Sequence, residues 1–123
     1  MIGKIYWSVF PFYDCRNQRN SFKKRPVLII GGPRNNDYTV LPVSSVSKRQ
    51  YLDGDYDLEL DPQKFPMLGL SKVCYLRTHK QTIVNQSALT TEICDFKSVC
   101  PDLYLQAMVL VEKFEKMLID GSI

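Results

Sequence analysis

The stretch Lys23-Lys24-Arg25-Pro26-Val27-Leu28-Ile29-Ile30-Gly31 decides the fold of this chain. Its cations lead directly into an unbroken apolar run, which is too short for a helix and has no polar face. The run therefore predicts a strand that is buried on both sides and lies centrally in a sheet. Proline has no N–H for a ladder, so Pro26 predicts that this strand begins at Arg25. A guanidinium held at the rim of such a scaffold is well placed to bind an anion such as phosphate.

The composition is that of one ordinary globular domain covering residues 1–123, with 45% hydrophobic and 24% charged residues. A net charge of +3 permits a polyanionic partner without requiring one. No run approaches the roughly 20 apolar residues of a membrane span, so we expect a cytoplasmic protein without membrane contact. Four cysteines without a C-x-x-C pair, beside a single histidine, predict free thiols, no metal site and no cofactor.

The chain before the central strand predicts one strand and one long loop. Residues 3–10 are rich in aromatic and β-branched side chains, which favours a strand that ends at Pro11. Trp7 in this strand is more commonly a partly buried sheet residue than a base-stacking one. Residues 12–24 have no period and predict a long connection. Its mixture of cations and aromatic rings suits a single-stranded nucleic acid, and a solvated surface loop explains it equally well. The basic residues of this segment are Arg16, Arg19, Lys23 and Lys24.

After the central strand, the turn residues at 31–37 and the apolar residues at 38–43 predict a β-hairpin. Ser44 and Ser45 follow directly, where regular pairing stops beyond Pro42. Strand ends of this kind often carry site residues. On pattern alone, two serines after a strand are more commonly a helix cap or a turn.

Alternation at residues 56–60 predicts a half-exposed strand whose acids, Asp57 and Glu59, face water along a solvated edge. A further strand is expected at 71–76, followed by a second cationic cluster. That cluster contains Arg77, His79 and Lys80.

The last part of the chain changes period. Residues 82–84 predict a short strand, and residues 85–91 a turn or one short helical piece. From Pro101 onward, apolar residues recur every three or four positions, which predicts one amphipathic helix that packs on the sheet and ends at Gly121.

Short strands with one terminal helix predict a mainly β fold, a small and strongly curved antiparallel sheet or barrel. Curvature can bring strand ends together, and Arg25, Ser44 and Arg77 all stand at predicted strand ends. Cleavage of RNA by its own 2′-hydroxyl needs fixed positive charge and groups that move protons. The two arginines offer the charge, Ser44 a hydrogen bond, and His79 a side chain that titrates near neutral pH. A lone histidine at a strand end is more often structural.

Several segments occur in the order known from one protein family. They are Gly3-Lys4-Ile5-Tyr6-Trp7, Arg25-Pro26-Val27-Leu28-Ile29-Ile30, Leu41-Pro42-Val43-Ser44-Ser45, Gly69-Leu70-Ser71-Lys72 and Tyr75-Leu76-Arg77-Thr78-His79-Lys80-Gln81-Thr82. With them the chain resembles the MazF/PemK toxins of bacterial type II toxin-antitoxin modules. The resemblance implies an SH3-like barrel with a C-terminal helix, and a homodimer with a cognate antitoxin. It also implies a sequence-selective mRNA interferase that cuts single-stranded RNA without metal and leaves a 2′,3′-cyclic phosphate.

The same resemblance implies roles for individual residues. Arg25 corresponds to a catalytic acid/base and charge stabiliser, Ser44 to a hydroxyl residue that is usually threonine, and Arg77 to a later catalytic arginine. We add His79 as a candidate proton carrier at a position where an acidic residue is common. The predicted RNA-binding residues are Arg16, Arg19, Lys23, Lys24, Ser45 and Lys80.

Two alternatives stay open at this point. One is a CcdB-like gyrase poison on the same fold, which would act through a C-terminal tryptophan, whereas this chain ends in Asp120-Gly121-Ser122-Ile123. The other is a decayed toxin that binds nucleic acid or a partner without cutting. Residues 19–24 also differ from the Gly-Ser-Glu-Gln-like segment of many relatives, so the RNA sequence that is cut does not follow from the resemblance.

Overall fold

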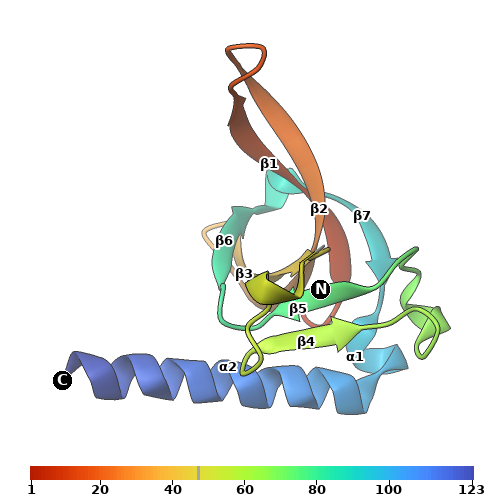
Figure 1. Cartoon of the computed structure of the whole chain (residues 1–123), viewed down its shortest axis with the longest axis vertical. Coiled ribbons are helices and arrows are strands. Elements are labelled where there is room, and N and C mark those ends of the chain that lie inside the picture. The colour runs from red at the N-terminus through yellow and green to blue at the C-terminus, as the bar shows by residue number, and fades with distance from the viewer. Residues whose placement is uncertain (47) are drawn as a thin grey trace.

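An antiparallel sheet of seven strands forms the body of the computed structural model, which describes residues 1–46 and 48–123 (Figure 1). The order across the sheet is β4-β5-β3-β2-β1-β7, and β6 pairs with β3. The sheet curls on itself and carries a helix at the C-terminus, which confirms the predicted mainly β fold. The strands are β1 (Ile5–Asp14), β2 (Arg19–Arg34), β3 (Asp37–Ser44), β4 (Asp57–Leu60), β5 (Cys74–Arg77), β6 (Thr82–Asn85) and β7 (Leu89–Cys94).

Helices close the open side of the curled sheet. The long helix α2 (Pro101–Ser122) begins at the predicted proline and runs one residue past Gly121. Its 22 residues span about 33 Å at 1.5 Å per residue, and it crosses the base of the sheet (Figure 1). No helix in the described ranges is long and apolar enough to cross a membrane. The shorter helices are α1 (Phe96–Val99) and the 3₁₀ turns η1 (Arg49–Tyr51), η2 (Pro66–Leu68) and η3 (Gln86–Ala88).

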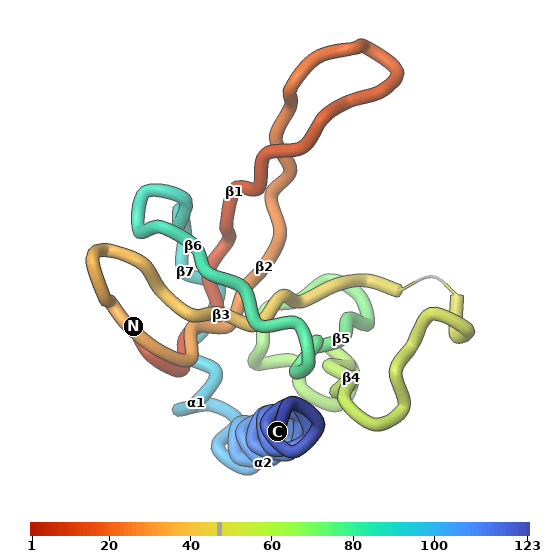
Figure 2. Tube along the Cα trace, turned by 90° about the vertical axis from the view of Figure 1, so that its left-hand side faces the viewer, coloured from red at the N-terminus to blue at the C-terminus, as the bar shows by residue number. Residues whose placement is uncertain are grey.

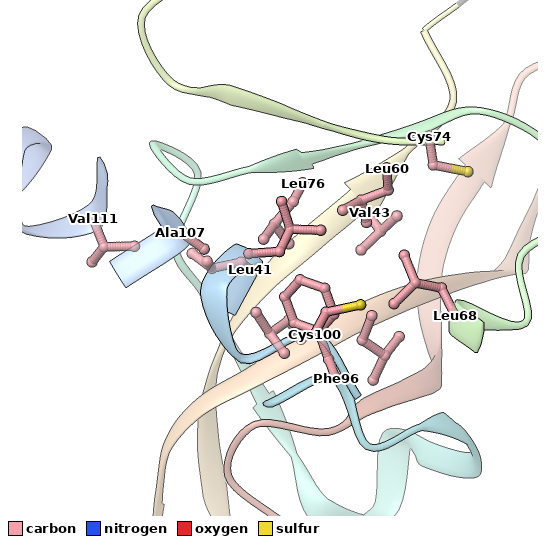
Figure 3. Packing of buried hydrophobic residues seen from close by; sticks show 13 residues of the cluster. Leu41, Val43, Leu60, Leu68, Cys74, Leu76, Phe96, Cys100, Ala107 and Val111 are labelled. Atoms are coloured by element: carbon pink, nitrogen blue, oxygen red, sulfur yellow. The ribbon is translucent and has the colours of Figure 1, made fainter. Parts of the chain in front are cut away.

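The central strand is buried on both faces, as its apolar run predicts. Val27, Leu28 and Ile29 are fully buried, and β2 lies between β1 and β3. Leu28 belongs to the larger core cluster, which also contains Phe96 and Cys100 from the helical segments and Leu41 and Leu76 from the sheet (Figure 3). Val27 and Ile29 belong to a second cluster on the other face of the sheet. Arg25 thus lies on the same strand as this fully buried run, two residues before it.

Residues 12–24 are not a loop, so this prediction was wrong. β1 continues through Pro11 to Asp14, and β2 begins at Arg19, six residues before the predicted start. Together they form a two-stranded ribbon that projects from the body of the molecule (Figures 1 and 2). We call residues 10–24 the arm. The sequence hid the arm because a ribbon exposed on both faces buries nothing, and no hydrophobic period marks it.

The turn at the tip of the arm is fixed by Asp14. Its carboxylate accepts hydrogen bonds from the backbone N–H groups of Arg16 and Asn17, at 3.0 and 3.3 Å. Asp14 also lies directly opposite Arg19 in the ladder, which places opposite charges across the strand pair. These local interactions set the register of the ribbon where no third strand supports it.

Both prolines inside the ribbon point their nitrogen atoms away from the partner strand. The N–H of Ile29 donates to the carbonyl of Lys4, the residue just before β1, and donors alternate along a strand, so the nitrogen of Pro26 faces the other side. On that side the ladder with β3 ends at the pair Val27–Pro42. The same alternation turns Pro11 toward the side where β7 has stopped pairing with β1 beyond Ser8. Neither proline therefore removes a ladder bond, which is why the strands do not end at them.

The later strands differ from the prediction at two places. The strand at 82–84 is confirmed as β6, whereas the strand expected at 71–76 begins only at Cys74. Residues 85–91 contain the short helical piece η3, but they also start β7, a strand that was missed. Thr90, Thr91 and Glu92 are three consecutive polar residues exposed at the edge of the sheet, so β7 shows no alternation of apolar and polar residues in the sequence.

All four cysteines are free thiols, as predicted. Burial raises the pKa of Cys94 to about 11 and also raises the pKa of Cys74 and Cys100. At neutral pH these groups are therefore protonated and poor nucleophiles or metal ligands. In the described part of the chain, no group of three His, Cys, Asp or Glu side chains is placed to hold a metal ion.

Candidate active site

A pocket of about 530 Å³ opens where β1 and β2 leave the body and meet the end of β3 and the loop before β5. It contains three cationic side chains and, among the described residues that line it, no acidic one. The pocket therefore attracts anions. Its lining residues are Trp7, Lys24, Arg25, Pro26, Val43, Ser44, Ser45, Gly69, Leu70, Ser71, Lys72 and Cys74. We call it the Arg25 pocket.

Arg25 sits on β2 directly opposite Ser8 of β1, two residues before the buried run. Its side chain is exposed, and no carboxylate of the described residues lies within ion-pairing distance of it. A guanidinium on a rigid strand without an internal partner keeps its planar fork of donors free for a ligand. Ser8 is fully buried, and its hydroxyl has no hydrogen-bond partner among the described residues.

Ser44 and Ser45 reach the same pocket from the end of β3. Val43 is buried in the core, and Ser44 pairs with Tyr75 of β5 at the last position of the ladder. The backbone is therefore fixed up to Ser44, while its half-buried side chain faces the pocket. The structure thus brings together Arg25 and Ser44, which the sequence had placed only at separate strand ends.

The loop from Gly69 to Lys72 forms the remaining wall. Gly69 ends η2 in the left-handed conformation, at φ 70°, which favours glycine. This turn leads the chain along the pocket and adds Lys72. The sequence analysis quoted this segment only as part of the family resemblance. A lysine two residues after a turn glycine carries no distinct signal by itself, so Lys72 was missed as a site residue.

Arg25 also borders a smaller hollow of about 280 Å³ on the opposite face of the ribbon. Phe10, Phe12 and Lys23 line it together with Thr82 of β6. The ammonium group of Lys23 lies 4.6 Å from the centre of the Phe12 ring, a cation–π contact that holds it against the arm. Arg25 is therefore accessible from both faces of the ribbon.

Arg77 does not line either hollow, and the structure places it in a buried ion pair. Its Nε donates to Oδ1 of Asp57 at 2.8 Å, and the two side chains are 17% and 2% exposed. Asp57 was predicted to face water with Glu59, so this prediction was wrong. β4 and β5 pair Asp57 with Arg77, and the second carboxylate oxygen accepts the N–H of Asp53. Opposite charge across the ladder therefore draws Asp57 inward, whereas Glu59 is exposed as predicted.

His79 belongs to the same cluster as Arg77. Its Nδ1 lies 3.7 Å from Oδ1 of Asp57, and its ring packs near Tyr56 and edge-on to Phe114 of α2. The ring centres are 5.8 and 6.1 Å away, respectively. These contacts attach the C-terminal half of α2 to the segment that leads into β4. The catalytic roles of Arg77 and His79 stay predictions.

The predicted RNA-binding residues fall into four places. Lys24 and Ser45 line the Arg25 pocket, and Lys23 lines the smaller hollow. Arg16 and Arg19 are exposed near the tip of the arm. Lys80 is exposed in the turn after β5.

No family model matches the sequence, and no curated protein matches it. A solved structure, the Mycobacterium tuberculosis toxin MazF-mt6, superposes with a TM-score of 0.57 over 95% of this chain and 96% of the toxin chain. The chain has the MazF fold. The two sequences are only 15% identical, so the likeness establishes the architecture, and the chemistry depends on the residues of this chain.

The MazF fold accounts for the curled sheet and the long C-terminal helix over almost the whole chain. It confirms the fold that the segment order predicted. The Arg25 pocket lies on this fold where β2 and β3 emerge from the core.

Proposed function

We propose that this protein is a metal-independent endoribonuclease of the toxin-antitoxin type that cuts single-stranded RNA at the Arg25 pocket. One observation carries the proposal: Arg25, Lys24 and Lys72 share a pocket with Ser44, and no carboxylate is among the described residues that line it. This charge suits a phosphodiester and opposes metal binding. The likeness of the fold to MazF-mt6 supports the same class of activity.

In the proposed reaction, the 2′-oxygen of a ribose attacks the neighbouring phosphorus and the bond to the 5′-oxygen breaks, which leaves a 2′,3′-cyclic phosphate. Arg25 stabilises the negative charge that grows on the phosphate oxygens and donates a hydrogen bond to the leaving 5′-oxygen, which takes its proton from water and becomes a 5′-hydroxyl. Ser44 donates to a second phosphate oxygen. The described residues that line the pocket include no histidine or carboxylate. Water therefore accepts the 2′-hydroxyl proton in our proposal.

The function is tested by incubating the purified protein with a long unstructured RNA, with and without EDTA. We expect discrete cuts at one short sequence, with 2′,3′-cyclic phosphate ends and equal rates in both samples. Cut positions are mapped by primer extension and the ends by phosphatase treatment. Loss of cutting in EDTA would contradict the metal-independent route. Absence of any cutting would redirect the search to gyrase or to binding without catalysis.

The proposal includes a homodimer, and the outer face of α2 supports it. Leu105 and Val109 are exposed and line an apolar hollow of about 500 Å³ beside Leu58 of β4. On the same stripe, Asp102 stands seven residues before Val109 and Lys116 seven residues after it. In an antiparallel pair of α2 helices centred on Val109, each Asp102 would face Lys116 of the second copy. Charge complementarity therefore favours a second copy as the occupant.

We expect the wild-type protein to elute with twice its monomer mass of 14.2 kDa in size-exclusion chromatography with light scattering. Val109→Glu should convert it to a monomer, because the new carboxylates would meet at the two-fold axis. Ile119→Glu, a matched change at an exposed apolar residue near the helix end, should leave the dimer intact. A wild-type monomer at all concentrations would contradict this part of the proposal.

A cytoplasmic location and a cognate antitoxin complete the proposed function. The antitoxin is expected to stop cutting when it is added in equimolar amount to the RNA assay, and the toxin–antitoxin pair is expected to bind DNA. Cutting that continues at full rate in excess of a bound partner would show that the partner is not its antitoxin.

A further inference from the structure

We propose that Trp7, Phe22 and Tyr13 form a stacking track along the arm, which holds bases of single-stranded RNA outside the cut site. This proposal rests on the proposed function, because it assumes that the RNA enters the Arg25 pocket. It adds a binding surface beyond that pocket and a reason for the arm to project from the molecule.

The three rings lie on one face of the ribbon. Residues directly opposite each other in an antiparallel pair share a face, and side chains two positions apart along a strand do so as well. The register pairs Trp7 with Pro26 and Pro11 with Phe22. Trp7, Pro11 and Tyr13 are separated by even numbers of residues, so Phe22 falls on the face of Trp7 and Tyr13. Trp7 also lines the Arg25 pocket, so this face continues directly outward from it.

These rings are more exposed than packing would require. Trp7 is 39% exposed, Tyr13 58% and Phe22 69%. Beyond Ser8 the ribbon pairs with no third strand, and the exposed fractions show that the rest of the described chain leaves these rings largely uncovered. Large aromatic residues left in water along a surface indicate a binding site. From Trp7 to Tyr13 the face extends about 20 Å, at about 3.3 Å per residue, a length that suits several nucleotides.

Charge favours nucleic acid as the occupant of this face. The arm contains four of the sixteen basic residues and one of the thirteen acidic residues, so the rest of the chain carries twelve of each. The whole net charge of +3 therefore resides on the arm. Lys24 shares the face of the rings, and Lys23 and Arg19 flank it from the other face. Cations beside exposed rings are the combination that binds single strands through phosphates and base stacking.

The test measures binding by fluorescence anisotropy with 2′-O-methyl RNA, which cannot be cut because its 2′-oxygen is blocked. The RNA contains the cleavage sequence or, if none is found, a mixed sequence. Phe22→Ala and Tyr13→Ala should each weaken binding of an oligonucleotide of about 12 nucleotides by about ten- to hundredfold. Phe22→Tyr should bind as wild type, because it keeps a ring for stacking. Phe22→Leu should bind as weakly as the alanine variant. Phe22 is exposed, so thermal melting should not change in any of these variants.

Salt dependence separates the rings from the cations. Lys24→Gln should reduce the slope of log affinity against log salt concentration by about 0.7, the value for one lost phosphate contact on a single strand. Phe22→Ala should leave that slope unchanged while lowering the affinity. Val99→Ala removes an exposed apolar side chain from α1, outside the arm and outside the described linings of both hollows, and serves as the matched control that should alter neither quantity.

Wild-type affinity in both Phe22→Ala and Tyr13→Ala would overturn the stacking track, even if the protein cuts RNA. Full binding by Phe22→Leu would also overturn it, since that result would show that RNA binding needs an apolar side chain at this position but no aromatic ring. If the wild-type protein cuts no RNA but Phe22→Ala loses affinity for 2′-O-methyl RNA, the track stands and the ribonuclease function fails. The two proposals can therefore fail separately.

Discussion

Arg25→Ala should reduce RNA cutting about a hundred- to a thousandfold and leave folding unchanged. The variant removes the side chain that we place against the phosphate, and one charge-stabilising donor of this kind contributes about 10²- to 10³-fold. Arg25 is exposed and forms no ion pair with the described residues, so its removal costs little free energy of unfolding. Initial cutting rates on one RNA substrate, together with thermal melting curves, measure both effects.

Two further variants control this result. Arg34→Ala removes an exposed arginine from the far end of the same strand, outside the described linings of both hollows, and should cut at the wild-type rate. Arg25→Lys keeps the charge but loses the bidentate fork, so an intermediate rate is expected. Cutting by Arg25→Ala at the rate of Arg34→Ala would remove Arg25 from the mechanism.

Asp57→Ala should lower the free energy of unfolding by about 3 kcal/mol, the largest stability change expected from a single polar residue here. The substitution leaves the Arg77 guanidinium, only 17% exposed, without its counter-ion. It also removes the acceptor for the N–H of Asp53, which fixes the segment before β4. Urea unfolding curves measure the change.

Glu59→Ala is the matched control, because Glu59 lies on the same strand and is exposed. It should change the free energy of unfolding by less than about 0.5 kcal/mol. The double variant Asp57→Ala/Arg77→Ala should be more stable than the sum of the two single changes predicts, since it leaves no unpaired buried charge. Equal stability of Asp57→Ala and Glu59→Ala would contradict the buried ion pair. The double variant also tests Arg77 in catalysis, because a folded protein that still cuts would show that Arg77 is not required.

The two prolines and the arm show where sequence reasoning reached its limit. Pro11 and Pro26 were interpreted as strand boundaries, although each occupies a position whose nitrogen faces no partner strand. Which side of a strand lacks a neighbour depends on where other strands end, and that information lies elsewhere in the chain. The arm was hidden for the related reason that its residues gain nothing from burial.

The predictions for the charged residues were limited in the same way. Alternation correctly placed Asp57 and Glu59 on one strand, but it could not distinguish them, because only the partner strand puts Arg77 opposite Asp57. Likewise, Arg25 and Ser44 were identified as strand-end residues without knowledge that they meet. No sequence pattern indicated Lys72 or Ser8 as site residues, since the role of a single polar residue depends on its neighbours in space.

The sequence by itself determined the elements that bury apolar surface with a clear period. These are the central run Val27–Ile30, the hairpin that follows it and the helix from Pro101, each of which is specified by neighbours in the chain. Only the tertiary structure decided which strand ends share the Arg25 pocket, which charges are buried together and which face of the arm carries the rings. The physical reason is that pocket lining, ion pairing and exposure depend on distances between residues far apart in sequence, and local pattern contains no information on those distances.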